Sequence, residues 1–150
     1  MSAIAWRFST FDSLSASELY VVLQLRSEVF VVEQACIFQD LDGADQKAMH
    51  LLGTQDGGLV AYARCFGAGV LHPEASIGRI VTRPAGRGRG IGSALVEQAI
   101  ACLSTLSGAS SIRIGAQARL VYFYRRHGFE VSGPPYLEDG IAHVGMLRHV

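Results

Sequence analysis

The stretch that decides the fold reads IVTRPAGRGRGIGS over residues 80–93. Its apolar start predicts a β-strand from about 76 to 82, and Pro84 ends that strand because proline cannot donate to a sheet ladder. Apolar residues at helical spacing predict a helix from about 91 to 106. Between the two lies a glycine-rich segment, residues 86–92, here called the glycine loop. This strand–loop–helix unit is typical of α/β domains.

The glycine loop is predicted to bind a phosphate group. The first turn of a helix carries unpaired N–H groups and a partial positive charge, and glycines let a phosphate approach the backbone. Arg87 and Arg89 can add charge-assisted hydrogen bonds. A P-loop is excluded because it ends in Gly-Lys-Ser/Thr, whereas residues 90–93 read GIGS. A dinucleotide fingerprint is excluded because the glycines alternate at 86, 88, 90 and 92.

The rest of the chain predicts further strands and helices around this unit. Ser15 and Glu18 form a capping box that opens a helix reaching about Phe30. Another helix is expected over 118–127, ended by Gly128 in a left-handed conformation. Alternation and turn residues predict strands near 4–8, 50–55, 59–66, 111–116, 129–131 and 142–147. The order of elements predicts a mixed α/β sheet.

Composition limits the classes of protein that this chain can represent. The 150 residues predict one domain, 1–150, and 49% hydrophobic against 17% charged residues exclude a disordered chain. Zero formal net charge argues against nucleic acid as a partner. Three scattered cysteines without a CxxC pair argue against a zinc site and favour a reducing compartment. No signal peptide core or apolar stretch of about 20 residues is found, so we expect a cytoplasmic protein without a membrane partner.

Two motifs resemble those of the GNAT superfamily of N-acetyltransferases. IVTRP at 80–84, then RxxGxG at 87–92 and an apolar helix, resembles its acetyl-CoA motif. QARLVYFYRRHGF at 117–129 resembles its second motif, in which a helix carries a tyrosine four residues before Gly-Phe. The chain is similar to the ElaA-like branch in LRSEVFVVEQ (25–34), QDLDG (39–43), HLLG (50–53), LVAYAR (59–64), GRIV (78–81), GAQA (115–118) and EDGIAH (138–143).

The resemblance implies a fold and a cofactor site. It implies a mixed, mostly antiparallel sheet of about seven strands, splayed between the fourth and fifth, with about four helices. The pantetheine arm of acetyl-CoA would pair with the fourth strand, and the pyrophosphate would lie on the glycine loop. No metal is expected. The contacts implied for coenzyme A are Ile80, Val81, Thr82, Arg87, Gly88, Arg89, Gly90, Ile91, Gly92, Ser93, Gln117 and Tyr124. Gln117 stands where many relatives have Asn.

Direct acetyl transfer requires a neutral amine, an oxyanion donor and a proton for the leaving thiolate. The resemblance implies Tyr124 as the acid, although its helical stripe also fits a packed core aromatic. For the base we favour Glu33 or His143, with a bound water as the alternative. The other titratable candidates are Asp40, Asp42, His50, Glu138 and Asp139. Arg79, in an apolar strand, is expected to pair with an acid such as Glu33 or Asp42.

The expected function is therefore acetyl transfer from acetyl-CoA to a primary amine of a small molecule or peptide. The partners are the cofactor and the acceptor, and a homodimer is compatible with the sequence. Two alternatives stay open. One is a coenzyme A-binding sensor or interaction module without turnover. The other is an acyltransferase that uses a longer acyl-CoA, or a relative of the autoinducer synthases.

Overall fold

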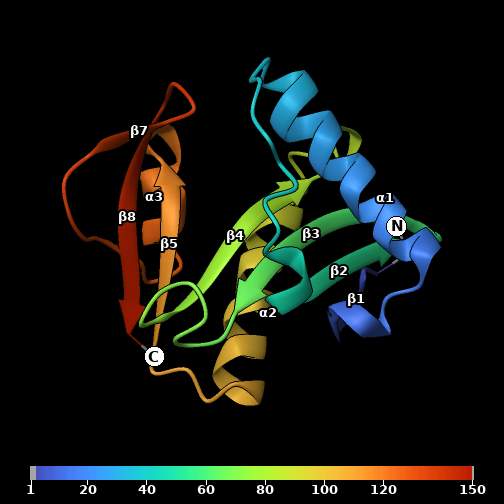
Figure 1. Ribbon diagram of the computed structural model, residues 1–150, viewed down its shortest axis with the longest axis horizontal. Coiled ribbons are helices and arrows are strands. Elements are labelled where there is room, and N and C mark those ends of the chain that lie inside the picture. The colour runs from blue at the N-terminus through green and yellow to red at the C-terminus, as the bar shows by residue number, and fades with distance from the viewer. Residues whose placement is uncertain (1–2, 150) are drawn as a thin grey trace.

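A computed structural model describes residues 3–149 as one sheet with helices on both faces (Figure 1). The strands are β1 (Ala5–Thr10), β2 (Met49–Gln55), β3 (Gly58–Phe66), β4 (Ala75–Thr82), β5 (Ser111–Gln117), β6 (Glu130–Val131), β7 (Tyr136–Glu138) and β8 (Ile141–His149). The longer helices are α1 (Ala16–Arg26), the π-helix η2 (Ser27–Glu33), α2 (Ile91–Leu106) and α3 (Val121–Arg125). The 3₁₀ turns are η1 (Phe11–Ser13), η3 (Asp45–Lys47), η4 (Pro84–Gly86) and η5 (Ala118–Leu120).

The sheet has the order β1-β2-β3-β4-β5-β8-β6, with β7 paired to β8. All neighbours are antiparallel except β4 and β5, which are parallel and paired at only two positions, Ala75 with Ile112 and Ser76 with Arg113. Beyond these pairs the two strands lean apart (Figure 1). The predicted mixed, mostly antiparallel sheet, splayed between the fourth and fifth strands, is confirmed.

Two apolar layers cover the two faces of the sheet. On one face Val22 and Leu25 of α1 pack with Leu52 and Tyr62. On the other face α2 packs through Leu95, Val96, Ala99 and Leu103 against Leu51, Ala61, Ala63, Cys65 and Ile77. Adjacent residues of β2, Leu51 and Leu52, serve opposite layers because strand side chains alternate between faces. This arrangement fixes β3 and β4, on which one side of the cleft described below is built.

Most local expectations are confirmed. The Ser15 hydroxyl accepts a hydrogen bond from the Glu18 amide at 3.0 Å, and the Glu18 carboxylate accepts one from the Ser15 amide at 2.8 Å. Asp56 and Gly57 have φ of 52° and 79°, as a tight hairpin turn between β2 and β3 requires. Gly128 has φ of 87° and ends the third helix as expected.

Some expectations are corrected. The helix predicted over 118–127 divides into η5 and the short α3, because the Val121 amide bonds to the Ala118 carbonyl in a 3₁₀ turn. The α3 helix then ends early, because the His127 and Phe129 amides turn back onto the Tyr124 carbonyl. The first helix changes to a π-helix at Ser27. Residues 3–149 contain eight strands, since β7 forms where the sequence predicts only a connecting turn, and three α-helices. Within the same residues no helix has the length and apolar character needed to cross a bilayer.

Candidate active site

A cleft of about 1320 Å³ separates β4 from β5. Residues 77–82 of β4 and 113–117 of β5 contribute to its walls, and Arg87 and Gly92 line it where the glycine loop meets α2. Within residues 3–149 the pairing of β4 with β5 stops at Ser76, so the facing strand edges beyond it have no ladder partner. An unpaired sheet edge is a template for another extended chain. The β4–β5 cleft can therefore hold an extended ligand along its walls.

A β-bulge at Arg79 bends β4 where the cleft opens. The register with β3 shifts there, with Tyr62 opposite Val81 but Arg64 opposite Gly78. Arg79 has φ of 49°, a left-handed conformation that costs a non-glycine residue about 1–3 kcal/mol. Asp40 holds the Arg79 guanidinium through its carboxylate at 2.7 Å from Nε and its carbonyl at 3.0 Å from Nη2. Bulges of this kind redirect a strand next to functional sites.

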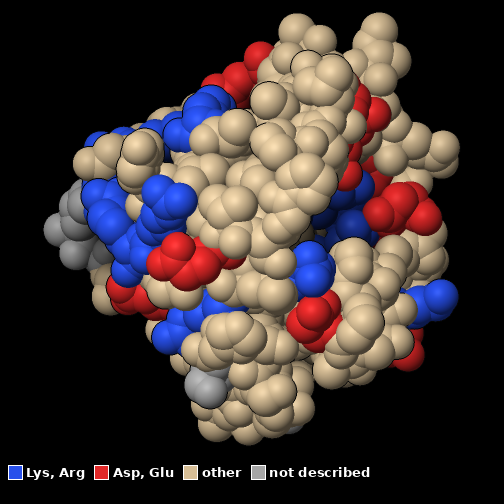
Figure 2. All heavy atoms as spheres, turned by 90° about the vertical axis from the view of Figure 1, so that its left-hand side faces the viewer, with Lys and Arg blue, Asp and Glu red and all other residues tan. Residues whose placement is uncertain are grey.

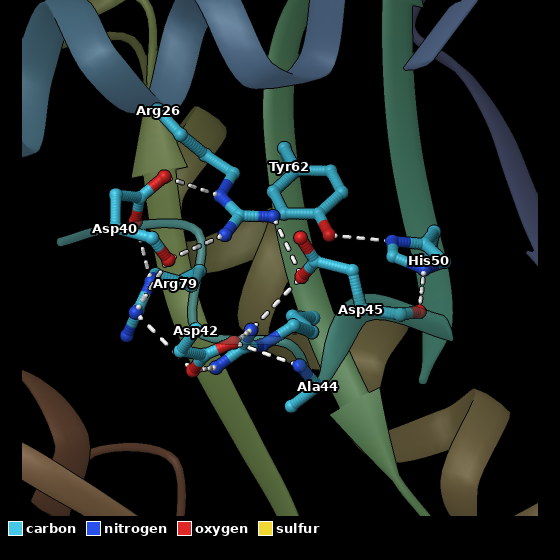
Figure 3. A network of polar contacts seen from close by, with 9 residues as sticks. Arg26, Asp40, Asp42, Ala44, Asp45, His50, Tyr62 and Arg79 are labelled. Carbon is cyan, nitrogen blue, oxygen red and sulfur yellow. Dashed lines mark hydrogen bonds and ion pairs between the residues drawn. The ribbon is translucent and has the colours of Figure 1, made fainter. Parts of the chain in front are cut away.

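Arg79 belongs to a largely buried network of alternating charges, drawn in Figure 3. We call it the arginine–aspartate network, and its members are Arg26, Arg64, Arg79, Asp40, Asp42 and Asp45. Asp45 accepts from Arg26 and Arg64, both at 2.9 Å, and Asp42 binds Arg64 through two contacts of 2.8 Å. The charges balance, and the network ties the segment after η2 to α1, β3 and β4.

The network corrects one prediction and removes several candidate bases. Arg79 pairs chiefly with Asp40 and more distantly with Asp42, at 3.5 Å, but not with Glu33. The Arg64 guanidinium holds the pKa of Asp42 far below its usual range, so this carboxylate is a poor proton acceptor. His50 is fully buried, and burial lowers its pKa. Its Nε2 donates to the Asp45 carbonyl at 2.9 Å and its Nδ1 accepts from the Tyr62 hydroxyl at 2.6 Å, so the role of His50 is structural.

The glycine loop leads directly into the first turn of α2. Gly90 is the N-cap and offers no side chain, so the amides of Ile91, Gly92 and Ser93 have no side-chain cap. The Ala94 amide is the first to bond back, to the Gly90 carbonyl at 3.1 Å. Gly88 and Gly90 have φ of 82° and 76°, and no heavy atom lies within 4 Å of the position that a Cβ would take at either. Uncapped amides next to this open space fit a phosphate group.

Arg87, expected on a phosphate, is bound to Glu33, which was expected to be a base. Nη1 and Nη2 of Arg87 meet the two carboxylate oxygens of Glu33 at 2.5 and 2.8 Å. This contact lowers the pKa of the Glu33 carboxyl, which makes it a weaker proton acceptor. The structure therefore brings together two predicted site residues, but as partners of each other.

Tyr124 lines the cleft from α3 and is 6% exposed. Its ring packs edge-on against Phe123 and Phe129, with centroids 5.1 and 6.1 Å away. No hydrogen bond joins its hydroxyl to another residue of the described chain. Burial raises the pKa of Tyr124 to about 12, so its hydroxyl keeps its proton near neutral pH. The ring is thus a packed aromatic whose hydroxyl is available to a ligand in the cleft.

His143 lines the cleft from β8, where it is paired in register with Gln117 of β5. Its ring stacks on Tyr136, with centroids 5.7 Å apart and planes at 22°. A carbonyl can only accept, so the 2.7 Å contact from Nδ1 to the Ile141 oxygen places the proton on Nδ1. Nε2 of the neutral ring then keeps its lone pair, 3.5 Å from a carboxylate oxygen of Glu138. This imidazole can accept a proton, and Glu138 can stabilise the resulting charge.

Sequence reasoning missed several residues of the cleft. Tyr136 belongs to β7, where a turn was expected, and its hydroxyl lies 2.7 Å from where a Cβ would stand at Gly115. Gln117 lines the cleft as expected, but its side-chain oxygen is bound by Arg119 at 3.1 Å. Figure 2 shows a hollow in this face with basic side chains at its floor and acidic ones at its rim. Residues 136–138 read Tyr-Leu-Glu and show no alternation of apolar and polar side chains, so local pattern gave no signal for β7.

Comparison with known proteins identifies the family. Residues 17–149 match the acetyltransferase (GNAT) domain. The chain is 40% identical to the protein ElaA of Escherichia coli K12 over 149 residues, 98% of this chain and 97% of ElaA. The crystal structure of Escherichia coli ElaA has a TM-score of 0.89 at 38% identity, over 97% of this chain and 99% of that one. The chain therefore belongs to the GNAT acetyltransferase family, and ElaA is one of its relatives.

Two further solved structures share the fold. An acyl-CoA N-acyltransferase from Pseudomonas aeruginosa has a TM-score of 0.92 at 40% identity, covering 97% of this chain and 99% of that chain. A GNAT family acetyltransferase from Elizabethkingia anophelis, with acetyl-CoA bound, has a TM-score of 0.68 at 13% identity and covers 100% of both chains. The predicted resemblance to the ElaA-like branch is confirmed, and the family supports an acyltransferase.

Proposed function

We propose that this protein transfers an acetyl group from acetyl-CoA to a primary amine of a small molecule or peptide. The observation that carries the proposal is the continuity of the β4–β5 cleft with the uncapped start of α2. An extended arm fits the unpaired strand edges, and a phosphate fits the amides next to them. The relative from Pseudomonas aeruginosa, named an acyl-CoA N-acyltransferase, supports an acyl-CoA as the donor.

In this proposal two regions of the protein bind different parts of the cofactor. The backbone of Ile80, Val81 and Thr82 would pair with the amide-containing pantetheine arm, in the cleft that Gln117 of β5 also lines. The phosphates would be held by residues of the glycine loop and the first turn of α2, namely Arg87, Gly88, Arg89, Gly90, Ile91, Gly92 and Ser93. When bound, acetyl-CoA supplies the activated thioester.

In this proposal Tyr124 protonates the departing thiolate and His143 removes a proton from the acceptor amine. Tyr124 lines the cleft, and its hydroxyl is protonated at neutral pH. His143 presents Nε2 with its lone pair, whereas the carboxylate of Glu33 is held by Arg87. His143 is therefore favoured over Glu33 as the base.

Turnover measured by mass spectrometry tests the function. Acetyl-CoA is incubated with the protein and a panel of small amines, amino acids and peptides, and acetylated products and free coenzyme A are quantified. The proposal expects an N-acetylated product. Binding of acetyl-CoA without turnover across the panel would favour the sensor alternative, and preferred turnover of octanoyl-CoA would favour the longer acyl donor.

The substitution Tyr124→Phe tests the role of the hydroxyl. It keeps the packed ring and removes only the proton donor, so kcat should fall by about 10²–10⁴-fold while cofactor affinity changes little. Steady-state kinetics and calorimetry measure the two effects, and thermal melting controls for folding. Wild-type kcat in a folded variant, with chemistry shown to limit turnover, would contradict the acid role and leave a packed aromatic.

A further inference from the structure

Glu33 and Arg87 form an ion pair unlike those of the arginine–aspartate network. Their side chains are 42% and 41% exposed, and both line the β4–β5 cleft. Water screens the attraction within an exposed pair, and such pairs contribute little to the stability of a fold. The guanidinium of Arg87 is therefore held by a carboxylate that a stronger anion can replace.

The position of Glu33 explains why it pairs with a cation. It is the last residue of η2, where the helix dipole places negative partial charge and disfavours a carboxylate. Arg87 relieves that conflict with two hydrogen bonds, and Arg119 adds a weaker attraction. The two carboxylate oxygens of Glu33 bind the guanidinium of Arg87 in the same two-point geometry that two oxygens of a phosphate group would adopt.

We propose that the Glu33 carboxylate binds Arg87 as long as no ligand is present. When acyl-CoA binds, one of its phosphate groups takes the place of that carboxylate on Arg87. This inference rests on the proposed function, because it requires a phosphate-bearing ligand on the glycine loop. The phosphate can displace the carboxylate since it also gains the free amides of Ile91, Gly92 and Ser93. Glu33 therefore lowers cofactor affinity and does not serve as the base.

The substitution Glu33→Gln tests the exchange, with coenzyme A titrated into the full chain by calorimetry. The amide keeps the size of the side chain and removes its charge, so coenzyme A should bind about two- to fivefold more tightly than to the wild type. The matched control is Glu28→Gln. Glu28 lies on the same helix, but its contact is Arg83 at 3.7 Å, and Arg83 is anchored on the Leu59 carbonyl. This control should change affinity little.

A double-mutant cycle separates exchange at Arg87 from a general effect of charge. In the Arg87→Ala background Glu33→Gln should no longer tighten binding, because the contact that it releases is already absent. A tightening that persists there would overturn the proposal in favour of simple repulsion between Glu33 and the phosphates. Unchanged or weaker binding in the single variant would overturn it as well.

Two further measurements keep this test distinct from a failure of the proposed function. Wild-type protein that binds no coenzyme A contradicts the proposed function itself. Where the wild type binds, only the behaviour of the Glu33 variants decides the exchange. Pantetheine, which lacks phosphate, should bind Glu33→Gln and wild type equally, and a tightening as large as that for coenzyme A would contradict exchange at a phosphate site.

Discussion

The cleft is lined by two kinds of arginine. They differ in how deeply they are buried and in how easily the carboxylate that binds them can be replaced. Arg64 is 4% exposed and is bound by Asp42 and Asp45, whereas the side chain of Arg87 is 41% exposed and is held by Glu33. A buried charge cannot lose its partner without a large penalty, but an exposed one can exchange it. The arginine–aspartate network therefore helps to build the walls of the cleft, and Arg87 belongs to the part that we propose binds the cofactor.

The largest effect is expected where a buried pair is broken. Asp45→Asn leaves Arg26 and Arg64 without the charge that both contact, so the free energy of unfolding should fall by about 3–5 kcal/mol. Urea denaturation measures this loss. Glu130→Gln makes the same change in the exposed 3.9 Å pair with Arg125 and should alter stability by less than about 0.5 kcal/mol. Equal losses in the two variants would erase the distinction between the two kinds of pair.

The next effect concerns binding at the glycine loop. Gly90→Glu places a carboxylate where the phosphate is expected, so coenzyme A affinity should fall by roughly 100-fold or more, in the range of an uncompensated like charge. Gly90→Ala is the control, because it imposes the same strain at φ of 76° without the charge. Calorimetry compares the two. If alanine weakens binding as much as glutamate does, backbone strain explains the loss and the open space at Gly90 is no phosphate site.

A smaller effect on the stability of the fold is expected when the pH is lowered. Contact with Arg64 lowers the pKa of Asp42 in the folded state, although burial opposes this. At Asp45 burial acts to raise the pKa, but the hydrogen bonds from Arg64 and Arg26 outweigh it, so this pKa is lowered as well. Their contribution to stability is therefore present above the unfolded pKa of about 3.9 and is lost as pH falls below it. Urea denaturation between about pH 6 and pH 3 should show this loss. A curve as steep for Asp45→Asn as for the wild type would mean that Asp45 contributes nothing to it.

Local chemistry made much of the fold predictable from the sequence. The capping box at Ser15, the turn at Asp56 and Gly57, and the ends of α2 each depend on neighbouring residues and agree with the structure. Local pattern could not predict the splay of the sheet, because the splay arises where β4 and β5, distant in sequence, stop pairing. It was available only through the resemblance of the two cofactor motifs.

The partners of the charged residues were much harder to predict. Arg26 lies on the apolar stripe of the first helix, and such an arginine requires a buried partner, but nothing local indicates Asp40 or Asp45. The pairing of Arg87 with Glu33 joins positions 54 residues apart and was missed for the same reason. Tyr124 was identified through the resemblance of residues 117–129 to the second motif of the family, in which a tyrosine stands four residues before Gly-Phe. Its acid role stays a prediction.

Amide hydrogen exchange with and without acetyl-CoA tests the central claim most directly. If the cofactor lies in the β4–β5 cleft with its phosphates on the glycine loop, peptides covering residues 78–93 should gain protection on binding. Peptides covering residues 40–47, already fixed by the arginine–aspartate network, should change little. Protection confined to another part of the molecule, or exchange at 78–93 unchanged under saturating acetyl-CoA, would contradict the account.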